Sequence, residues 1–454
     1  MNVSPTVKYL KETSREFSLY VNETRGIPLI SDGLKHVQRV SLWVMRNEPS
    51  KVKVVGLVGR LADMGLYVHG DVACADAISL LAAPYCNNVM LLQGDGQFGS
   101  RTAIKDGIGS PRYVSVKRST ASQSFLYVDT DVVPLEDNYD GSNKQPVHFL
   151  PLIPTVLLNG ISGIGVGYST EILPRRLSDI ITGTIKALKG KKVDRLIPHY
   201  ARYDVTVKET GQNNQWEITG KATIVDTSTV KITELPPGMS LENFRSRLID
   251  LEDTDQIVRY TDNSADAISI TVTFKRGSIT TWKEKDAIAF FKLSEKTTER
   301  IVVRDWTGNK IVQYPDAETV VEDFVKWRLE WYTTRYEKMM ADATYELTYW
   351  RVLAALFANG FTKRLGTFAN RKALEEDVLS VAKKSKISLD DEQLNRVVGL
   401  ATYRWTKEFE GEVAEKISAL ETSIRDYDDI VGSPDRRRSI YLEELEGLKK
   451  KNCE

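Results

Sequence analysis

The chain has 454 residues, a length that predicts two to four domains with separate hydrophobic cores. Hydrophobic residues make up 41% and charged residues 27%, which is typical of a folded globular protein and unlike a small peptide or a disordered chain. The formal net charge is zero. This balance excludes a uniformly basic nucleic-acid-binding protein, so any basic surface must be local.

The cysteines and the N-terminal segment indicate in which cellular compartment the protein is found. The chain has three cysteines, Cys74, Cys86 and Cys453, and none belongs to a C-x-x-C pair. An odd number without paired spacing favours a reducing compartment over a disulfide framework. The N-terminal segment carries a charge every few residues and lacks the apolar run of a signal peptide. We therefore expect a cytoplasmic protein.

One stretch could be mistaken for a membrane span. Residues 149–168 carry no charge, yet they include two prolines and four glycines. A spanning helix would tolerate these residues poorly. The pattern favours a buried strand-and-turn segment and no membrane partner.

The first region, residues 1–145, mixes short helical patterns with glycine turns, which predicts a compact α+β unit. Its clearest helix covers Val72 to Ala83, with Asp71 as the expected N-cap and Pro84 as the stop. A helix start of this kind presents free backbone N–H groups, which can bind a phosphate.

The second region, residues 146–318, alternates β-rich runs with polar turns. Examples are the runs 217–219 and 267–274, and one helical stretch covers Leu241 to Leu251. These patterns predict a second α+β domain.

The third region, residues 319–454, has a different period. After Pro315, apolar residues recur at three- and four-residue steps without glycine or proline, which predicts one helix of about 40 residues. A second periodic segment covers Phe409 to Tyr427, after a short helical insert at 374–398. The two long helices should pair as an antiparallel coiled coil with a small globular tip. One more helix is expected at 435–454.

A basic segment lies in the first region. The glycine-rich stretch 93–101 ends at Arg101, and between Arg101 and Arg118 lie Lys105, Arg112 and Lys117 against one acid. Such local charge can contact nucleic-acid phosphates. On composition alone, a solvated basic loop that contains a half-buried tyrosine is the better explanation of Arg112-Tyr113.

Six motifs in fixed order decide between these readings, because together they resemble the cleavage subunits of type IIA DNA topoisomerases. The motifs are Arg25-Gly26-Ile27-Pro28 with Ser31-Asp32-Gly33-Leu34-Lys35-His36-Val37-Gln38-Arg39, then His69-Gly70-Asp71, Gln93 to Ser100, Arg112-Tyr113, Asp137-Asn138-Tyr139-Asp140-Gly141, and Leu157 to Gly167. Ile232-Thr233-Glu234-Leu235-Pro236 matches a further element of that family. The short length and Gly167-Tyr168 are most similar to the medium subunits of T-even-type phage topoisomerases, which would place the protein in a host cytoplasm.

The resemblance implies a multidomain α+β fold. Residues 1–145 would form an N-terminal arm and a winged-helix DNA-cleavage domain, and residues 146–318 a tower domain. Residues 319–454 would form a coiled coil and a C-terminal gate through which two copies dimerise. This division agrees with the organisation that the periodicity predicts.

The resemblance also implies roles for single residues. Tyr113 would attack a DNA phosphorus and keep the 5′-phosphate, and Arg112 would stabilise the phosphoryl oxygens. The expected DNA-binding residues are Arg25, Lys35, Arg39, His69, Arg101 and Ile164. Ile164 would insert between base pairs as an apolar wedge. Without the resemblance, the alternatives are a structural hydrogen bond for the histidine, ordinary surface roles for the cations, and a core position for the isoleucine.

Two positions depart from the family pattern. His36 stands where much of the family has proline, and Val72 stands where bacterial enzymes often have serine. Neither position is adjacent to the proposed nucleophile in the sequence.

The sequence shows neither a glycine-rich ATP site nor the clustered carboxylates of the family's metal-binding domain. The resemblance therefore implies that a partner subunit carries the ATPase and the metal-binding (TOPRIM) domain and holds ATP and Mg²⁺. The other expected partners are double-stranded DNA and a second copy of the chain. We expect the assembled enzyme to relax and decatenate DNA without introducing negative supercoils, because no wrapping domain follows the last helix.

Two alternatives remain. A non-enzymatic winged-helix DNA-binding protein would not need the Arg112-Tyr113 pair. A tyrosine recombinase would require a scattered Arg-His-Arg set before a C-terminal tyrosine, and the chain has only four histidines and no such arrangement.

Overall fold

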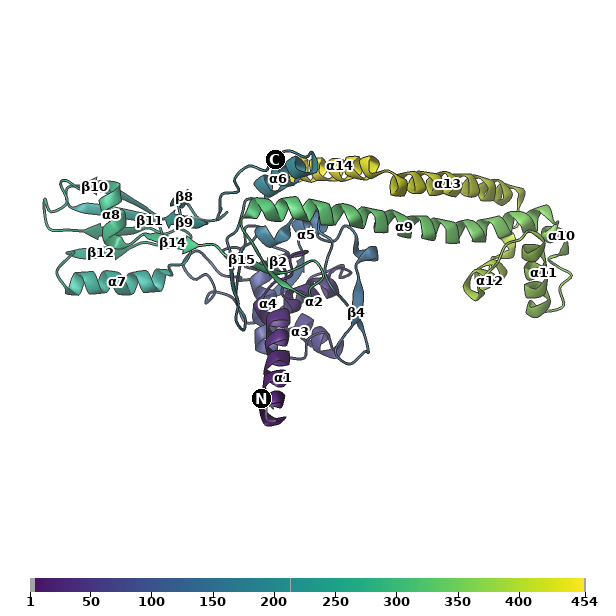
Figure 1. Cartoon of the computed structure of the whole chain (residues 1–454), viewed down its shortest axis with the longest axis horizontal. Coiled ribbons are helices and arrows are strands. Elements are labelled where there is room, and N and C mark those ends of the chain that lie inside the picture. Colours follow the sequence, from purple (N-terminus) through teal and green to yellow (C-terminus); the bar gives the residue numbers. More distant parts are fainter. Residues whose placement is uncertain (1–4, 213, 453–454) are drawn as a thin grey trace. The chain divides into compact units, whose positions relative to one another are not determined.

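The computed structural model describes residues 5–212 and 214–452, which form two compact units. The first unit contains the described residues up to Arg328 together with those from Leu442 on, and the second is Leu329–Tyr441. Figure 1 labels the elements along the chain. Within the described ranges, no helix is both long and apolar enough to cross a bilayer. Cys74 and Cys86 are free thiols, and Cys453 lies outside the described residues.

The first unit begins with helices around a small antiparallel sheet of strand order β1-β3-β2. The helical elements are α1 (Pro5–Val21), η1 (Asn22–Gly26), α2 (His36–Met45), α3 (Val54–Asp63), α4 (Asp71–Ala82) and α5 (Thr120–Phe125). The strands are β1 (Val52–Lys53), β2 (Leu92–Asp95) and β3 (Ser115–Arg118). Apolar residues of α2, α3 and α4 are fully buried, among them Leu42, Leu57 and Ile78. Their burial stabilises this α+β unit.

Helix α4 begins one residue earlier than the sequence predicts. Gly70 occupies the N-cap position in an extended conformation, and no side chain caps the helix. The prediction that Asp71 is the N-cap is therefore wrong. Asp71 is the first helical residue, where its negative charge still interacts favourably with the helix dipole.

Two β-hairpins, short helical turns and one α-helix follow. They comprise η2 (Thr130–Val132), β4 (Leu135–Asp137), β5 (Lys144–Pro146), η3 (Thr155–Leu157), β6 (Ile161–Ile164), β7 (Ser169–Ile172) and α6 (Leu177–Leu188). The uncharged stretch 149–168 is buried from Phe149 to Leu158 and then becomes the β6–β7 hairpin. The predicted burial is thus confirmed for residues 149–158, but this half contains turns and no strand. The predicted strand is β6, which lies in the partly exposed second half.

The β-rich part of the first unit has a core of its own. Its elements are β8 (Thr206–Glu209), β9 (Gln215–Thr219), β10 (Lys221–Asp226), β11 (Thr229–Glu234), α7 (Leu241–Asp253), β12 (Arg259–Asp262), β13 (Ile270–Thr273), α8 (Glu284–Phe291), β14 (Ser294–Thr298), β15 (Ile301–Arg304) and β16 (Ile311–Tyr314). The antiparallel sheets have the orders β10-β11-β13-β12, β14-β9-β8 and β15-β16. Alternate residues of β11 and β13, such as Ile232 and Val272, pack in one cluster with Phe244 of α7 and Phe291 of α8. The predicted helix at 241–251 and the predicted strands are confirmed.

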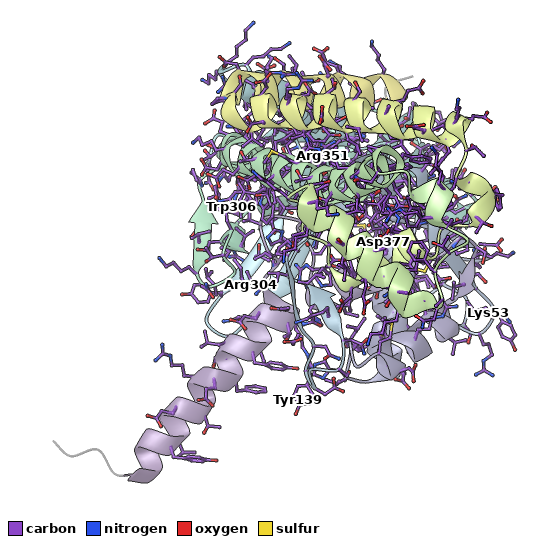
Figure 2. The ribbon with its side chains drawn as sticks, turned by 90° about the vertical axis from the view of Figure 1, so that its right-hand side faces the viewer. Lys53, Tyr139, Arg304, Trp306, Arg351 and Asp377 are labelled. Atoms are coloured by element: carbon purple, nitrogen blue, oxygen red, sulfur yellow. The ribbon has the colours of Figure 1, made fainter. Side chains whose placement is uncertain are left out.

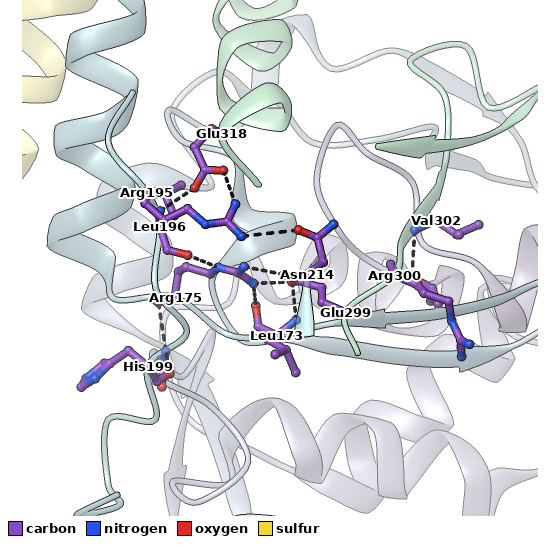
Figure 3. Close-up of polar contacts among 12 residues, drawn as sticks. Leu173, Arg175, Arg195, Leu196, His199, Asn214, Glu299, Arg300, Val302 and Glu318 are labelled. Atoms are coloured by element: carbon purple, nitrogen blue, oxygen red, sulfur yellow. Dashed lines mark hydrogen bonds and ion pairs between the residues drawn. The ribbon is translucent and has the colours of Figure 1, made fainter. Parts of the chain in front are cut away.

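A buried ion pair joins the segments that follow β7 and β14, and a more exposed pair lies beside it. Figure 3 shows the guanidinium of Arg175, which donates to both carboxylate oxygens of Glu299 and to the carbonyl of Leu173. Beside it, Arg195 donates to Glu318 at 2.9 Å. Because the charges of Arg175 and Glu299 are paired and hydrogen-bonded, their burial is tolerated, and removal of one partner would leave an isolated buried charge.

The second unit is helical. Helix α9 (Ala317–Ala358) is 42 residues long, in agreement with the predicted length, and its part from Leu329 on belongs to this unit. The remaining elements are α10 (Phe361–Arg364), α11 (Arg371–Lys384), α12 (Asp391–Val398), η4 (Thr402–Arg404), α13 (Lys407–Gly432) and α14 (Pro434–Asn452), the last of which begins in this unit.

Contacts between α9 and α13 show how these two helices run. The rings of Tyr336 and Tyr427 lie 5.8 Å apart, and the side chain of Arg351 donates to Glu421 at 2.8 Å. Since the later residue of α9 meets the earlier residue of α13, the two helices are antiparallel, as their periodicity predicts. Helix α13 ends at Gly432, before Ser433 and Pro434 and beyond Tyr427, where the predicted periodic segment ends.

Candidate nucleic-acid interface and cleavage site

Tyr113 projects from a turn whose backbone is fixed. Its amide donates to the carbonyl of Ser110 at 2.9 Å, and the carbonyls of Pro111 and Val114 accept from the first residues of α3. Val114 is buried, whereas the Tyr113 side chain is 76% exposed. The phenol is therefore presented to solvent by a rigid backbone. The alternative of a half-buried structural tyrosine does not fit this exposure.

Arg112 is the closest cation to this phenol in the sequence, and it is also exposed. Its guanidinium carbon lies 5.9 Å from the centre of the Tyr113 ring. In the part of the chain that the structure describes, Arg112 forms no ion pair. Both side chains are thus free to contact a ligand on the same surface.

A second cluster of predicted residues lines a groove of about 810 Å³. Its wall includes Arg25 from η1, Lys35 from the start of α2 and His69 from the turn before α4. Neither Arg112 nor Tyr113 is among the residues that line it. The structure therefore separates the predicted residues into a phenol with its neighbouring arginine, and a groove rich in cations, which we call the cationic groove.

His69 lies between two tyrosine rings in the cationic groove. Its ring centroid is 5.9 Å from that of Tyr20 and 5.2 Å from that of Tyr67, and a hydrogen bond of 2.5 Å links Tyr20 Oη to His69 Nε2. Burial, with a contribution from the positive charge of Arg25, lowers the pKa of His69. The imidazole is consequently neutral at pH 7, and one ring nitrogen remains for another partner.

Lys35 connects the groove to the β6–β7 hairpin. Its ammonium donates to the carbonyl of Ser162 at 2.9 Å, and burial lowers the pKa of Lys35. The hairpin itself packs closely on η1. A Cβ atom on Gly163 would come within 2.0 Å of the Gly26 carbonyl oxygen, so only glycine permits this approach.

Ile164 ends strand β6 on the same hairpin and is 85% exposed. The hairpin tip is fixed by Asn22, which accepts from the amide of Val166 at 2.7 Å and donates to its carbonyl at 3.2 Å. A core position for Ile164 is therefore excluded. A large apolar side chain on a fixed, exposed tip is suited to insertion into another molecule.

Arg39 and Arg101 are buried rather than exposed. Arg39 donates to both carboxylate oxygens of Asp32, at 2.7 and 2.9 Å. Arg101 donates to Glu234 on β11 and to the carbonyl of Leu235. Both guanidinium groups are engaged inside the protein, and Arg39 also lines the cationic groove. Neither residue is included in the DNA surface that we propose.

The structure adds groove residues that are not among the DNA-binding residues expected from the sequence. His36 and Arg304 line the cationic groove, as does Tyr20. Burial and the neighbouring charges of Arg39, Arg304 and His69 lower the pKa of His36 to about 4. Arg304 belongs to β15, far from the other groove residues in the sequence, and only the fold brings it to this wall. No local pattern could have identified it.

Comparison with known proteins now gives the family. A family model described as the A-type subunit of DNA gyrase/topoisomerase IV matches residues 25–446. The chain belongs to this family. The chain is 28% identical over 424 residues to the DNA topoisomerase medium subunit of Enterobacteria phage T4, covering 89% of this chain and 90% of the phage protein. It is also 30% identical to human DNA topoisomerase 2-beta over 71% of this chain, but it spans only 21% of that protein.

A solved structure shows the same fold. The DNA-binding, cleavage and re-ligation domain of Plasmodium falciparum topoisomerase II superposes with a TM-score of 0.82 at 21% sequence identity, over 99% of this chain and 66% of that one. The predicted family is thus confirmed, and so is the predicted role as the DNA cleavage and re-ligation subunit of a type II topoisomerase.

The family uses Mg²⁺, an ion that proteins hold through clustered oxygen ligands such as carboxylates. Among residues 5–212 and 214–452, no group of three or more histidine, cysteine or acidic side chains could hold a metal ion. The described residues therefore do not fit a metal site.

Proposed function

We propose that Tyr113 is the nucleophile of DNA cleavage. The phenol oxygen attacks a backbone phosphorus, the bond from phosphorus to the 3′-oxygen breaks, and the 5′-phosphate stays on the tyrosine. The phenol proton passes to solvent and the departing 3′-oxygen gains a proton. Attack by this 3′-hydroxyl on the phosphotyrosine reverses both changes, so resealing needs no external energy. The observation that carries the proposal is an exposed phenol on a fixed turn, beside an arginine that forms no ion pair with any described residue.

Arg112 and the cationic groove have separate tasks in this proposal. Arg112 stabilises the negative charge that grows on the phosphoryl oxygens in the transition state. Arg25, Lys35 and His69 bind the DNA backbone on either side of the scissile bond. Ile164 inserts between base pairs and bends the duplex. Two copies of the chain would be needed to cut both strands.

The domain assignment follows the same reasoning. We assign residues 1–145 to the arm and winged-helix domain, 146–318 to the tower, and 319–454 to the coiled coil and dimer gate. We also assign ATP hydrolysis and the Mg²⁺ site to a partner subunit with a TOPRIM domain. Passage of a second duplex through the break would then give relaxation and decatenation.

The deciding experiment is Tyr113→Phe in the complex with its partner subunit. The substitution removes one hydroxyl, so DNA binding and thermal unfolding should be unchanged while the SDS-resistant protein–DNA adduct disappears. The matched control is Tyr403→Phe, since Tyr403 is 77% exposed. Use of 5′-labelled and 3′-labelled duplexes identifies which end is joined to the protein. Normal adduct formation by Tyr113→Phe would refute the assignment and favour a DNA-binding protein without this chemistry.

A further inference from the structure

Arg304 has a fixed place in the wall of the cationic groove. Its amide donates to the carbonyl of Pro28 at 2.9 Å, and its carbonyl accepts from the amide of Ile30 at 3.0 Å. On the other side, Arg304 pairs with Ile311 of β16. Figure 2 labels Arg304 near one end of α1. This position agrees with the groove lining, which includes both Arg304 and Tyr20 of α1. Its backbone cannot move without disturbing the segment that carries the first motif.

The side chain of Arg304 lacks the partner that other buried arginines have. Arg39, Arg101 and Arg175 each form an ion pair with a buried carboxylate. Within the described residues, the Arg304 guanidinium makes no hydrogen bond and no ion pair, and its Nε atom is buried without a partner.

Nearby acids do not fill this role. Glu23, Asp32 and Glu136 act on Arg304 through space and favour its charged form, but Asp32 already binds Arg39. Burial, followed by repulsion from Arg39, lowers the pKa of Arg304 to about 10. The group therefore remains a cation at neutral pH in spite of its partial burial.

A partly buried cation without a counterion is costly, and an anion from outside the chain would remove the cost. The Nε–H is closed to solvent, whereas the two Nη groups are not among the buried atoms without a partner. The edge formed by two Nη groups of a guanidinium can bind two oxygens of one phosphate or carboxylate. Arg25 and Lys35 line the same groove together with the acids Glu23, Glu136 and Asp137. Asp137 is already paired with Lys144. Three cations in one groove favour a ligand that presents several negative charges. A nucleic-acid backbone has this property.

We propose that Arg304 is a further phosphate-binding residue of the cationic groove, and that its two Nη groups take a backbone phosphodiester of the cleaved duplex. The proposal rests on the proposed function only in taking duplex DNA as the occupant of the groove. It does not depend on which side chain is the nucleophile.

The test is Arg304→Gln in the full chain, with Arg276→Gln as the matched control because Arg276 is exposed in the turn before α8. Binding to a fluorescent duplex is measured by anisotropy from 50 to 200 mM salt. Loss of one phosphate contact should reduce the slope of log K against log salt by about 0.9 for each occupied groove. Arg304→Gln should also raise Kd about tenfold, as expected for loss of one charge-assisted hydrogen-bonded contact. Arg276→Gln should change neither quantity.

Thermal unfolding separates a ligand role from a structural one. Removal of an unpaired cation should leave Tm unchanged or raise it. A lower Tm together with an unchanged salt slope would overturn the proposal and make Arg304 a structural residue. Should Arg304→Gln fail to fold, Arg304→Lys provides the test, because it keeps the charge but cannot offer two parallel N–H groups. Its salt slope should be retained while its Kd rises, and an unchanged Kd would contradict the proposal.

The experiments also distinguish other causes of failure. If Arg304→Gln binds DNA normally but no longer binds the partner subunit, the missing anion is a carboxylate of that partner and the proposal is wrong. If Arg304→Gln behaves as proposed while Tyr113→Phe still forms the adduct, the proposed nucleophile fails and the role of Arg304 stands.

Discussion

Truncation of the exposed wedge residue, Ile164→Ala, should weaken DNA bending without weakening the fold. The side chain is 85% exposed, so loss of three carbon atoms should change the free energy of unfolding by no more than about 0.5 kcal/mol. Between base pairs the same carbons would be buried. At about 0.8 kcal/mol for each CH₂ group, truncation removes about 2.4 kcal/mol from the bent complex. The ratio of bent to straight DNA should therefore fall about 50-fold, since about 1.4 kcal/mol corresponds to a factor of ten.

The bend can be measured by energy transfer between dyes at the two ends of a short duplex, with the full chain at saturating concentration. Ile249→Ala is the matched control, because Ile249 is 48% exposed on α7 in the β-rich part. An unchanged bend with Ile164→Ala would show that the isoleucine does not enter the duplex. A loss of more than about 1 kcal/mol in unfolding free energy would show instead that it packs within the protein.

Three further outcomes follow from the site and its supports. Arg112→Ala should bind DNA normally but form the adduct about 10²- to 10³-fold more slowly in single-turnover measurements, and a normal rate would assign phosphoryl stabilisation to another residue. Glu299→Ala leaves the Arg175 cation buried without its counterion, so denaturant titration should show a loss of about 3–5 kcal/mol in unfolding free energy; a loss below about 1 kcal/mol would contradict the role given to this pair. Because burial lowers the pKa of His36 to about 4 from an ordinary value of 6.5, the fold binds fewer protons than the unfolded chain between these values. The neutral His36 side chain should therefore contribute about 3 kcal/mol to the free energy of unfolding above pH 6.5, and this contribution should be lost as the pH falls towards 4. His36→Gln should remove this part of the acid sensitivity.

The sequence predicts the elements that depend on local pattern. The long helix α9 and its antiparallel partner α13 follow from apolar residues at helical spacing, which needs no knowledge of distant contacts. The start of α4 shows the limit of such reasoning. An aspartate before an apolar run favours an N-cap, yet Asp71 is the first residue of the helix and the N-cap is Gly70, whose extended backbone is sufficient without a side-chain cap.

Residues of the candidate site can be predicted from the sequence where they belong to one continuous motif. They cannot be predicted where their position depends on residues that are distant in the sequence. Arg112-Tyr113 lies in one motif, and its exposure agrees with the role expected from it. Arg101 also lies in a motif, but its counterion is on β11, 133 residues away, so its burial could not be foreseen. Arg304 is the opposite case, because no motif marks it and only the pairing of β15 beside Pro28 brings it to the groove.

The close packing of the β6–β7 hairpin on η1 has a consequence for the choice of cleavage site. Contacts of Gly163 with Gly26 and of Asn22 with Val166 hold Ile164 at a constant offset from Arg25. A duplex whose phosphates occupy the groove must therefore unstack at one fixed step to admit the isoleucine. The energy of unstacking depends on the base step and is lowest at pyrimidine–purine steps. We expect the local stiffness of DNA to influence where the protein cuts, and we expect nicked or mismatched steps to be favoured.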